Sequence, residues 1–252
     1  MRRRRYSTKI LSRGPSKSGS VEKSFSLEPR LLQDILTFAK PMGHREQADS
    51  LNLGFGFVYY GLVRALRPRH IVVIGSGYGF SVVCLALGLK DNGAGELSFV
   101  DPSYSLLRDG PAQTIGGANF WHDPEQVRTH FARFGVERIV THHKCTSEEF
   151  FRRYDDHGRG PIDLAFIDGN HAFDHVDHDV IATLRHSRRN TYLLLHDTNI
   201  YVRELLRHAG VKRWLRTKAT AHRAAFEYVD FPLASGVALL RVLEPTVWKQ
   251  FC

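Results

Sequence analysis

The sequence is poor in cysteine and contains no long apolar run. Its three cysteines, Cys84, Cys145 and Cys252, lie far apart and form no C-x-x-C pair. Neither a disulfide framework nor a thiolate metal site is therefore expected, and a reducing, cytoplasmic setting fits this usage best. Apolar runs such as 71–74 and 192–195 are far shorter than the ~20 residues that cross a bilayer. The N-terminus also lacks the apolar stretch of a secretory signal, and we expect no contact with a membrane.

Acidic residues are scarce at one end of the chain. The formal net charge is +9, and residues 1–30 hold nine Lys or Arg but only two Glu, a net of +7 that leaves +2 for residues 31–252. Residues 1–26 show no apolar periodicity and carry Gly and Pro among serines, so we expect a disordered basic leader there and one folded domain over 27–252. Such charge runs are usually just solvated. The rest of the chain is close to neutral, so we expect binding to nucleic acid only through this tail, if at all.

Beyond residue 70, short apolar runs alternate with segments of helical periodicity. Strands are predicted at 71–74, 97–100, 139–142, 164–167 and 192–195, and helices at 80–89, 124–134, 147–154, 173–186 and 201–209. Continuously apolar strands separated by helices indicate a mostly parallel sheet that is covered on both faces. Two further runs, 224–229 and 236–242, predict a C-terminal antiparallel hairpin. The predicted fold class is α/β, a doubly wound, mostly parallel seven-stranded sheet.

Two more helices are predicted before the first strand, at 28–40 and 47–66. Together they make residues 27–68 an expected N-terminal helical lid on the domain. The stretch 51–60 is rich in glycine and aromatic residues, and we expect it to interrupt the second helix as a loop over a site.

A glycine-rich turn follows the first predicted strand and opens a helix. Glycines there let the backbone turn tightly and approach a ligand closely, and the helix N-terminus offers free amides. The turn predicts a site for a nucleotide-type cofactor, although a tight turn without a ligand is the plain alternative. Phe80 stands where the dinucleotide-binding fingerprint requires its last glycine, which disfavours NAD. The candidate cofactor residues in this turn are Gly75, Ser76, Gly77, Tyr78, Gly79 and Ser81.

Asp101 ends the second predicted strand, 22 residues after Gly79. A carboxylate at this tip can accept hydrogen bonds from both hydroxyls of a ribose. The alternative is that Asp101 caps the next turn.

With these features the chain resembles the class I S-adenosylmethionine-dependent methyltransferases, and nearest to them the branch of catechol and caffeoyl-CoA O-methyltransferases and cephalosporin-hydroxylase-like proteins. The resemblance covers residues 45–245 and rests on the glycine turn, on Asp101, and on two motifs at the ends of later strands, Phe-Ile-Asp168-Gly-Asn-His171 and Leu-His196-Asp197-Thr-Asn199. It implies a Rossmann-like fold in which the turn cradles the methionine part of the cofactor and Asp101 holds the ribose.

The same resemblance places Thr146 where an acidic residue near the adenine is often found, and Val73 where another acidic residue is usual. It implies methylation of a hydroxyl on a small molecule. The absence of an Asn-Pro-Pro-Tyr motif also argues against amide or adenine N-methylation.

Asp168 and Asp197 each follow a buried strand, so their carboxylates should emerge at the edge of the sheet where ligands bind. With Asn199 they form an all-oxygen set suited to Mg²⁺. In the O-methyltransferases that the chain resembles, the matching positions hold a metal that activates the acceptor hydroxyl. The alternative is that Asp168 contacts only the cofactor or caps a turn.

His171 and His196 flank these carboxylates and are candidate general bases, because imidazole titrates near neutral pH. Together with Asp168 they are the expected catalytic residues, and His171 is favoured as the base. His171, His175 and His178 also have the spacing of a helical zinc site, but interleaved aspartates favour a solvated face. Trp121 is expected either to stack on the adenine or to pack in the core.

Two other functions stay open. An NAD-dependent oxidoreductase also needs a glycine turn and an acidic strand tip. A catalytically inactive methyltransferase-like binding module would tolerate the departures at Val73 and Thr146. The sequence does not identify the acceptor, and it leaves open whether the protein forms a homodimer.

Overall fold

Seven strands form one mixed sheet at the centre of the computed structural model, which describes residues 25–104, 107–109, 112–114, 119–158, 160–199 and 210–251. Their order across the sheet is β5-β2-β1-β6-β7-β9-β8. The first five are parallel, while β9 runs antiparallel to both β7 and β8. The predicted doubly wound α/β class with its terminal hairpin is thereby confirmed. The strands are β1 His70–Ile74, β2 Glu96–Val100, β5 Val140–His143, β6 Ile162–Ile167, β7 Ser187–His196, β8 Phe226–Phe231 and β9 Val237–Val242.

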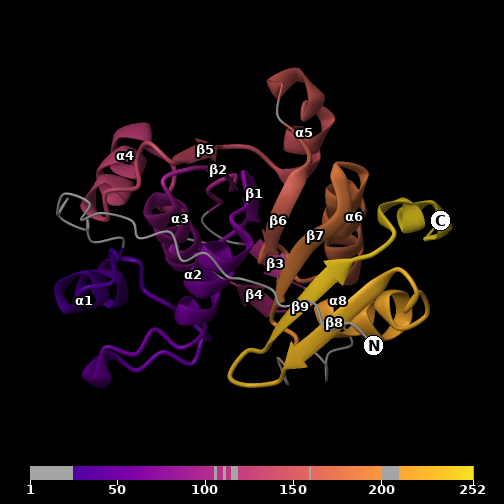
Figure 1. The fold of residues 1–252 in the computed structure, drawn as a ribbon, viewed down its shortest axis with the longest axis horizontal. Helices are drawn as coiled ribbons and strands as arrows, with labels where there is room; N and C mark the ends of the chain where they lie inside the picture. Colours follow the sequence, from indigo (N-terminus) through magenta and orange to yellow (C-terminus); the bar gives the residue numbers. More distant parts are fainter. Residues whose placement is uncertain are drawn as a thin grey trace, which may run out of the picture.

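Helices cover both faces of this sheet (Figure 1). Alternate strand residues point to opposite faces, so Ile71 and Val73 join one apolar cluster while Val72 and Ile74 join the other. The first cluster receives α1 Pro29–Phe38, α2 Phe55–Leu66, α3 Phe80–Asn92 and α4 Pro124–Arg133. The second receives α5 Ser147–Arg152, α6 Phe173–Arg185 and α8 Gly210–Trp214.

The second predicted helix differs from the observed chain. A short 3-10 turn, η1 Ala48–Ser50, comes first, and α2 starts only at Phe55. The expected loop over 51–60 is wrong for most of its length, because α2 runs through it with Tyr59 fully buried. Gly56 in this stretch is a contact point between two helices. A Cβ on Gly56 would lie 2.7 Å from the Phe80 ring, so the absence of a side chain lets α2 and α3 approach closely.

Several short elements were not predicted from the sequence. They are the small hairpin of β3 Leu107–Asp109 and β4 Ala112–Thr114, the 3-10 turns η3 Asp155–His157 and η5 Pro245–Gln250, and the π-helical turn η4 Leu215–Ala219. The expected helix at 201–209 and most of the expected leader at 1–26 lie outside the described residues. In the described part of the chain, no helix is long and apolar enough to cross a membrane.

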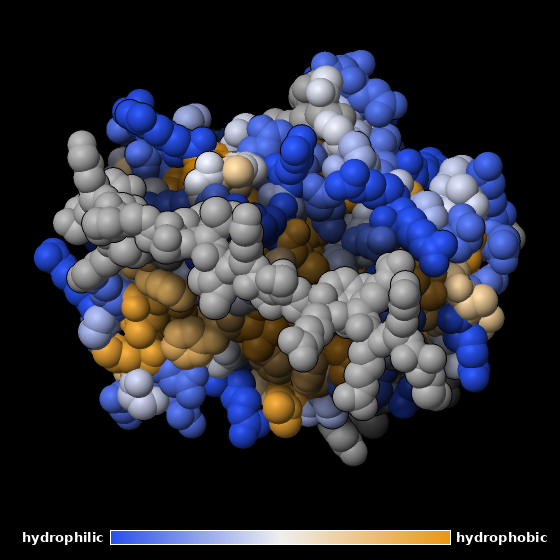
Figure 2. Space-filling view, viewed as in Figure 1, coloured by the Kyte–Doolittle hydropathy of each residue, from blue (hydrophilic) through white to orange (hydrophobic). Residues whose placement is uncertain are grey.

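Apolar side chains also reach the surface in places. Figure 2 shows them gathered in the lower part of the viewed face, in the region where Figure 1 places α1 and α2. Phe57 and Val58 on α2 are among the exposed large hydrophobic side chains, as are Tyr228 and Val229 on the edge strand β8. The remaining visible surface is largely hydrophilic.

Candidate active site

The glycine turn joins β1 to α3 at the carboxyl edge of the sheet. Gly75 and Gly79 have φ angles of +67° and +88°, in the left-handed region that favours glycine. A Cβ on Gly75 would lie 2.5 Å from the Asp168 carbonyl oxygen, and one on Gly79 would lie 2.9 Å from the Trp121 ring. Both positions therefore exclude side chains because protein atoms already lie there. Gly77 differs, since among the described residues a Cβ there would meet only the Met42 side chain, at 3.1 Å.

The polar and aromatic residues of the turn brace it. The hydroxyls of Ser76 and Ser81 are 2.6 Å apart and hydrogen-bond to each other. The Tyr78 ring lies under the Lys40 ammonium, 4.6 Å from it. Trp121 is fully buried and donates its Nε1–H to the Gly77 carbonyl at 2.8 Å. Of its two expected roles, the structure supports packing in the core, where Trp121 holds the glycine turn from behind, and not stacking on a nucleoside base.

Asp101 lies beside this turn. The β1–β2 register pairs Ile74 with Val100, so Gly75 and Asp101 leave the sheet next to each other. The Asp101 carboxylate accepts the Ser103 backbone N–H at 2.7 Å, which is the expected turn cap, and no other hydrogen bond to this carboxylate is found among the described residues. Burial raises the pKa of Asp101 to about 6. The hydrogen bond from Ser103 lowers this pKa, and the nearby Asp168 raises it further.

Thr146, the residue expected near an adenine, is the N-cap of α5. Its hydroxyl accepts the Glu149 backbone N–H at 3.2 Å, and the Glu149 carboxylate accepts the Thr146 N–H at 3.0 Å. This reciprocal pair is a capping box, which satisfies two amides at the start of the helix. The capping role accounts for Thr146 without a ligand.

Carboxylates and imidazoles meet at the ends of β6 and β7. The register pairs Ile167 with Leu195, which places Asp168 beside His196. His196 Nδ1 lies 2.9 Å from Asp168 Oδ1 and 3.2 Å from Asp197 Oδ1. His171 spans the same two carboxylates, with Nε2 3.3 Å from Asp168 Oδ1 and Nδ1 2.9 Å from Asp197 Oδ2. The predicted catalytic residues and two of the three predicted metal ligands are thus brought together.

This cluster is buried enough to perturb its ionisable groups. Burial by itself lowers the pKa of His196, but the Asp168 and Asp197 carboxylates outweigh that effect and raise it to about 9. Burial raises the pKa of Asp197 to about 7, and His196 opposes the rise. Near neutral pH, His196 is therefore a cation that lies between the Asp168 and Asp197 side chains.

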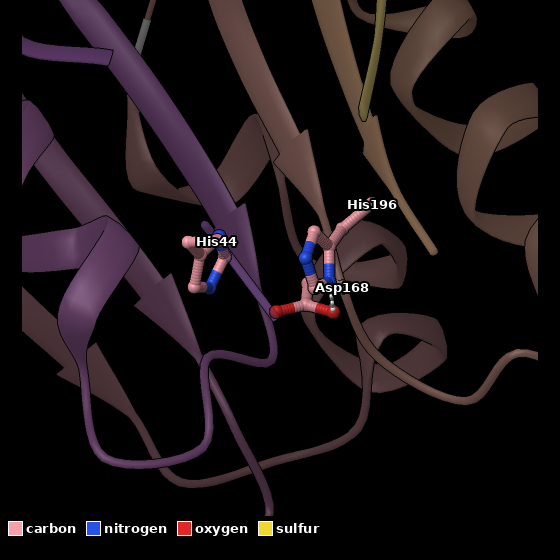
Figure 3. A group of neighbouring side chains, drawn as sticks. All are labelled: His44, Asp168 and His196. Carbon is pink, nitrogen blue, oxygen red and sulfur yellow. Dashed lines mark hydrogen bonds and ion pairs between the residues drawn. The ribbon is translucent and has the colours of Figure 1, made fainter. Parts of the chain in front are cut away.

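His44, which the sequence did not single out, completes the cluster. It precedes α2 in a segment that crosses the strand ends, and its ring stacks on His196 with centroids 4.3 Å apart. Its Nδ1 is 3.0 Å from the Tyr59 hydroxyl, and the side chain is 4% exposed. Burial, reinforced by His196, lowers the pKa of His44 to about 3, so this ring is neutral. Figure 3 shows both rings above the Asp168 carboxylate.

Other predicted ligands lie elsewhere. The Asn199 amide donates to the carbonyls of Pro232 and Ala234, at 3.1 and 3.5 Å, and so holds the turn between β8 and β9. Asn199 is not gathered with Asp168 and Asp197, which corrects the expected all-oxygen set. The histidine triplet is not assembled either, because His171 precedes α6 while His175 and His178 are exposed on that helix.

Comparisons with known proteins agree with this architecture. A family model described as a methyltransferase domain matches residues 72–198. The O-methyltransferase TomG of Streptomyces achromogenes, involved in tomaymycin synthesis and solved with SAM, has a TM-score of 0.60 and 18% identity over 90% of this chain and 93% of its own. An O-methyltransferase of Bacillus cereus solved with SAH has a TM-score of 0.60 and 17% identity, covering 84% of this chain and 90% of its own.

A third structure, a putative caffeoyl-CoA O-methyltransferase from Staphylococcus aureus, has a TM-score of 0.55 and 13% identity, over 86% of this chain and 92% of its own. Among curated sequences, the uncharacterized protein y4gI of Sinorhizobium fredii is 26% identical over 180 residues. That alignment includes 71% of this chain but only 18% of y4gI, so the chain spans less than a fifth of this relative.

Proposed function

Because the chain belongs to the family of methyltransferase domains, we propose that it is an S-adenosylmethionine-dependent methyltransferase that methylates a hydroxyl group of a small molecule. The observation that carries the proposal is the direct contact between the glycine turn and the acid–base cluster. Gly75 packs against the backbone of Asp168, whose side chain bonds His171 and His196. A cofactor in the turn and a base for the acceptor would therefore be neighbours.

The residues around the turn suit this cofactor. Gly77 meets only a flexible Met42 side chain, so its backbone is open to a close approach. The Asp101 carboxylate accepts one hydrogen bond within the described residues, and it has further acceptor capacity with which it would bind ribose hydroxyls. The solved TomG and Bacillus cereus proteins were crystallised with SAM and SAH, which supports the same cofactor class here. Bound S-adenosylmethionine supplies an electrophilic methyl group on a sulfonium centre.

The protein's own part in methyl transfer is to deprotonate and align the acceptor. His171 is the base in this proposal. Its side chain is 14% exposed, against 5% for His196, so it is the imidazole that an acceptor reaches more easily. Asp197 orients the ring through Nδ1, and Asp168 faces Nε2. His171 would take the hydroxyl proton at Nε2, whose 3.3 Å contact with Asp168 is the longer of its two contacts. The methyl group would pass from the sulfonium sulfur to the hydroxyl oxygen, with the cofactor's thioether as the leaving group, and the adjoining carboxylates would stabilise the imidazolium that results.

The proposed methyl transfer does not involve Mg²⁺. Two carboxylates of the expected set are present, but Asn199 is committed to the β8–β9 turn and imidazoles occupy the space around the acids. This mixed nitrogen and oxygen donor set does not fit the preference of Mg²⁺ for oxygen. A cytoplasmic location is part of the same proposal, and the free thiols of Cys84 and Cys145 support it.

A methyl-transfer assay with labelled S-adenosylmethionine and a panel of phenols and aliphatic alcohols tests the proposal. We expect label in at least one methyl ether. His171→Ala should lower kcat by about 10²- to 10⁴-fold, the range for loss of a general base, with little change in cofactor affinity. His175→Ala, an exposed histidine on α6, is the matched control and should retain full activity. Full turnover in His171→Ala would remove this residue from the mechanism.

A further inference from the structure

His44 and His196 have no part in the proposed proton transfer, yet the protein buries both beside Asp168. Their side chains come from separate places, His44 from the segment before η1 and His196 from the end of β7. One ligand atom from each residue, together with one from Asp168, lies within 4.8 Å of the other two. Figure 3 shows one Asp168 oxygen bonded to His196 and the other extending toward the side of His44.

His196 has an unsatisfied atom in this cluster. Its Nδ1 faces the two carboxylates, but its Nε2 is buried without a hydrogen-bond partner in the described part of the protein. The Gly43 carbonyl favours the protonated ring but does not complete a hydrogen bond to Nε2. A buried polar atom left without a hydrogen-bond partner destabilises the folded protein. An imidazole that is oriented through one nitrogen, and whose other nitrogen has no hydrogen-bond partner, has the arrangement of a metal ligand.

His44 is also oriented through its Nδ1. This nitrogen contacts the Tyr59 hydroxyl, and in the described part of the chain no hydrogen bond joins its Nε2 to another group. The backbone around His44 is held on both sides, because its N–H donates to the Glu46 carboxylate at 2.9 Å and its carbonyl accepts the Phe55 N–H at 2.8 Å. The Phe80 ring packs on the imidazole with centroids 4.7 Å apart. Such support fixes a ligand before the metal arrives.

We propose that His44, Asp168 and His196 form a binding site for a divalent transition-metal ion. Two imidazole nitrogens and one carboxylate suit borderline ions such as Zn²⁺, Co²⁺ or Fe²⁺ and leave coordination positions open, whereas Mg²⁺ prefers oxygen throughout. Ligand atoms around one such ion lie about 3.3–4.4 Å apart, since the bonds are about 2.0–2.2 Å long. To bind it, the three side chains draw closer, and the two imidazole rings, which lie 24° from parallel with centroids 4.3 Å apart, tilt so that one nitrogen of each points at the ion. The ion takes the place of the proton on His196 Nε2, and Asp197 adds negative charge nearby.

Metal binding tests this site without cofactor or acceptor, so its failure is distinct from a failure of methyl transfer. Full-length protein stripped with EDTA is titrated with Co²⁺ and followed by its visible d–d absorption, and with Zn²⁺ by calorimetry in millimolar Mg²⁺. We expect one ion per chain that excess Mg²⁺ does not displace. His44→Gln should weaken binding at least ~10-fold, and His175→Gln should leave it unchanged.

A measurement on the unaltered protein covers the case in which His44→Gln does not fold. X-ray absorption of protein loaded with one equivalent of Zn²⁺ should show outer-shell scattering from two imidazoles. Absence of Co²⁺ and Zn²⁺ binding, equal affinity in His44→Gln, displacement by equimolar Mg²⁺, or a Zn²⁺ environment with fewer than two imidazoles would each overturn the assignment.

Discussion

Asp179 makes the stability of this protein depend on pH. The residue lies in α6 against the sheet and is 3% exposed, and its Oδ1 has no hydrogen-bond partner in the part of the chain that the structure describes. Burial raises the pKa of this carboxyl from 3.8 to about 7, with the Ser147 side chain opposing the rise. The folded protein therefore holds the Asp179 proton over a pH range in which the unfolded chain has lost it.

The sign and size of the effect follow from this shift. Because the folded-state pKa is the higher one, the stabilisation is fully present below the unfolded pKa and is lost as pH rises through about 7. A shift of about 3 pH units corresponds to a total loss of about 4 kcal/mol, of which about 2.5 kcal/mol falls between pH 5 and pH 8. Asp179→Asn has nearly the same shape and does not titrate, so it should remove this loss.

Urea denaturation at a series of pH values measures the effect. The free energy of unfolding of Asp179→Asn, relative to the unaltered protein, should rise by about 2.5 kcal/mol from pH 5 to pH 8. Asp174→Asn, at an exposed position of the same helix, is the control and should show no such trend. Parallel pH profiles for the unaltered protein and Asp179→Asn would refute the argument.

Three further substitutions test the glycine turn and its surroundings. Gly75→Ala places a Cβ 2.5 Å from the Asp168 carbonyl at a positive φ and should lower the free energy of unfolding by about 3 kcal/mol; unchanged urea denaturation would contradict that close approach. Trp121→Phe removes the hydrogen bond to the Gly77 carbonyl, so the free energy of unfolding should fall by about 2 kcal/mol and the affinity for S-adenosylhomocysteine should fall as well. Lost affinity at an unchanged free energy of unfolding would indicate that Trp121 stacks on the cofactor. Thr146→Ala should cost about 1 kcal/mol through the lost N-cap and leave that affinity intact; calorimetry showing a large loss of affinity would restore the adenine role.

The sequence predicted the features that depend on local pattern. Apolar runs marked the strands, and the parallel order of β6 and β7 implied that Asp168 and Asp197 would leave the same edge of the sheet. Burial was harder to predict. Trp121 sits in a loop whose sequence fits either a ligand contact or a core residue, and only the packing of α4 and Phe99 against it decides between them.

Two site residues depended on geometry that no local pattern encodes. His44 reaches Asp168 across a separation of more than a hundred residues, because the segment after α1 folds over the strand ends. Asn199 was expected beside Asp197 because the two are close in sequence. Asp197, however, has a φ of +66°, and the chain turns there, so that Asn199 is directed into the β8–β9 turn.

The most direct test of the proposed function is calorimetric titration of the full chain with S-adenosylhomocysteine and, separately, with NADH. S-adenosylhomocysteine should bind at one site, and NADH should not bind. Asp101→Ala, which removes the carboxylate at the tip of β2, should weaken that binding by about 10- to 100-fold, as loss of one or two hydrogen bonds to a charged acceptor would. Binding of NADH without S-adenosylhomocysteine, or full affinity in Asp101→Ala, would contradict the assignment of this strand edge to a methyl-donor cofactor.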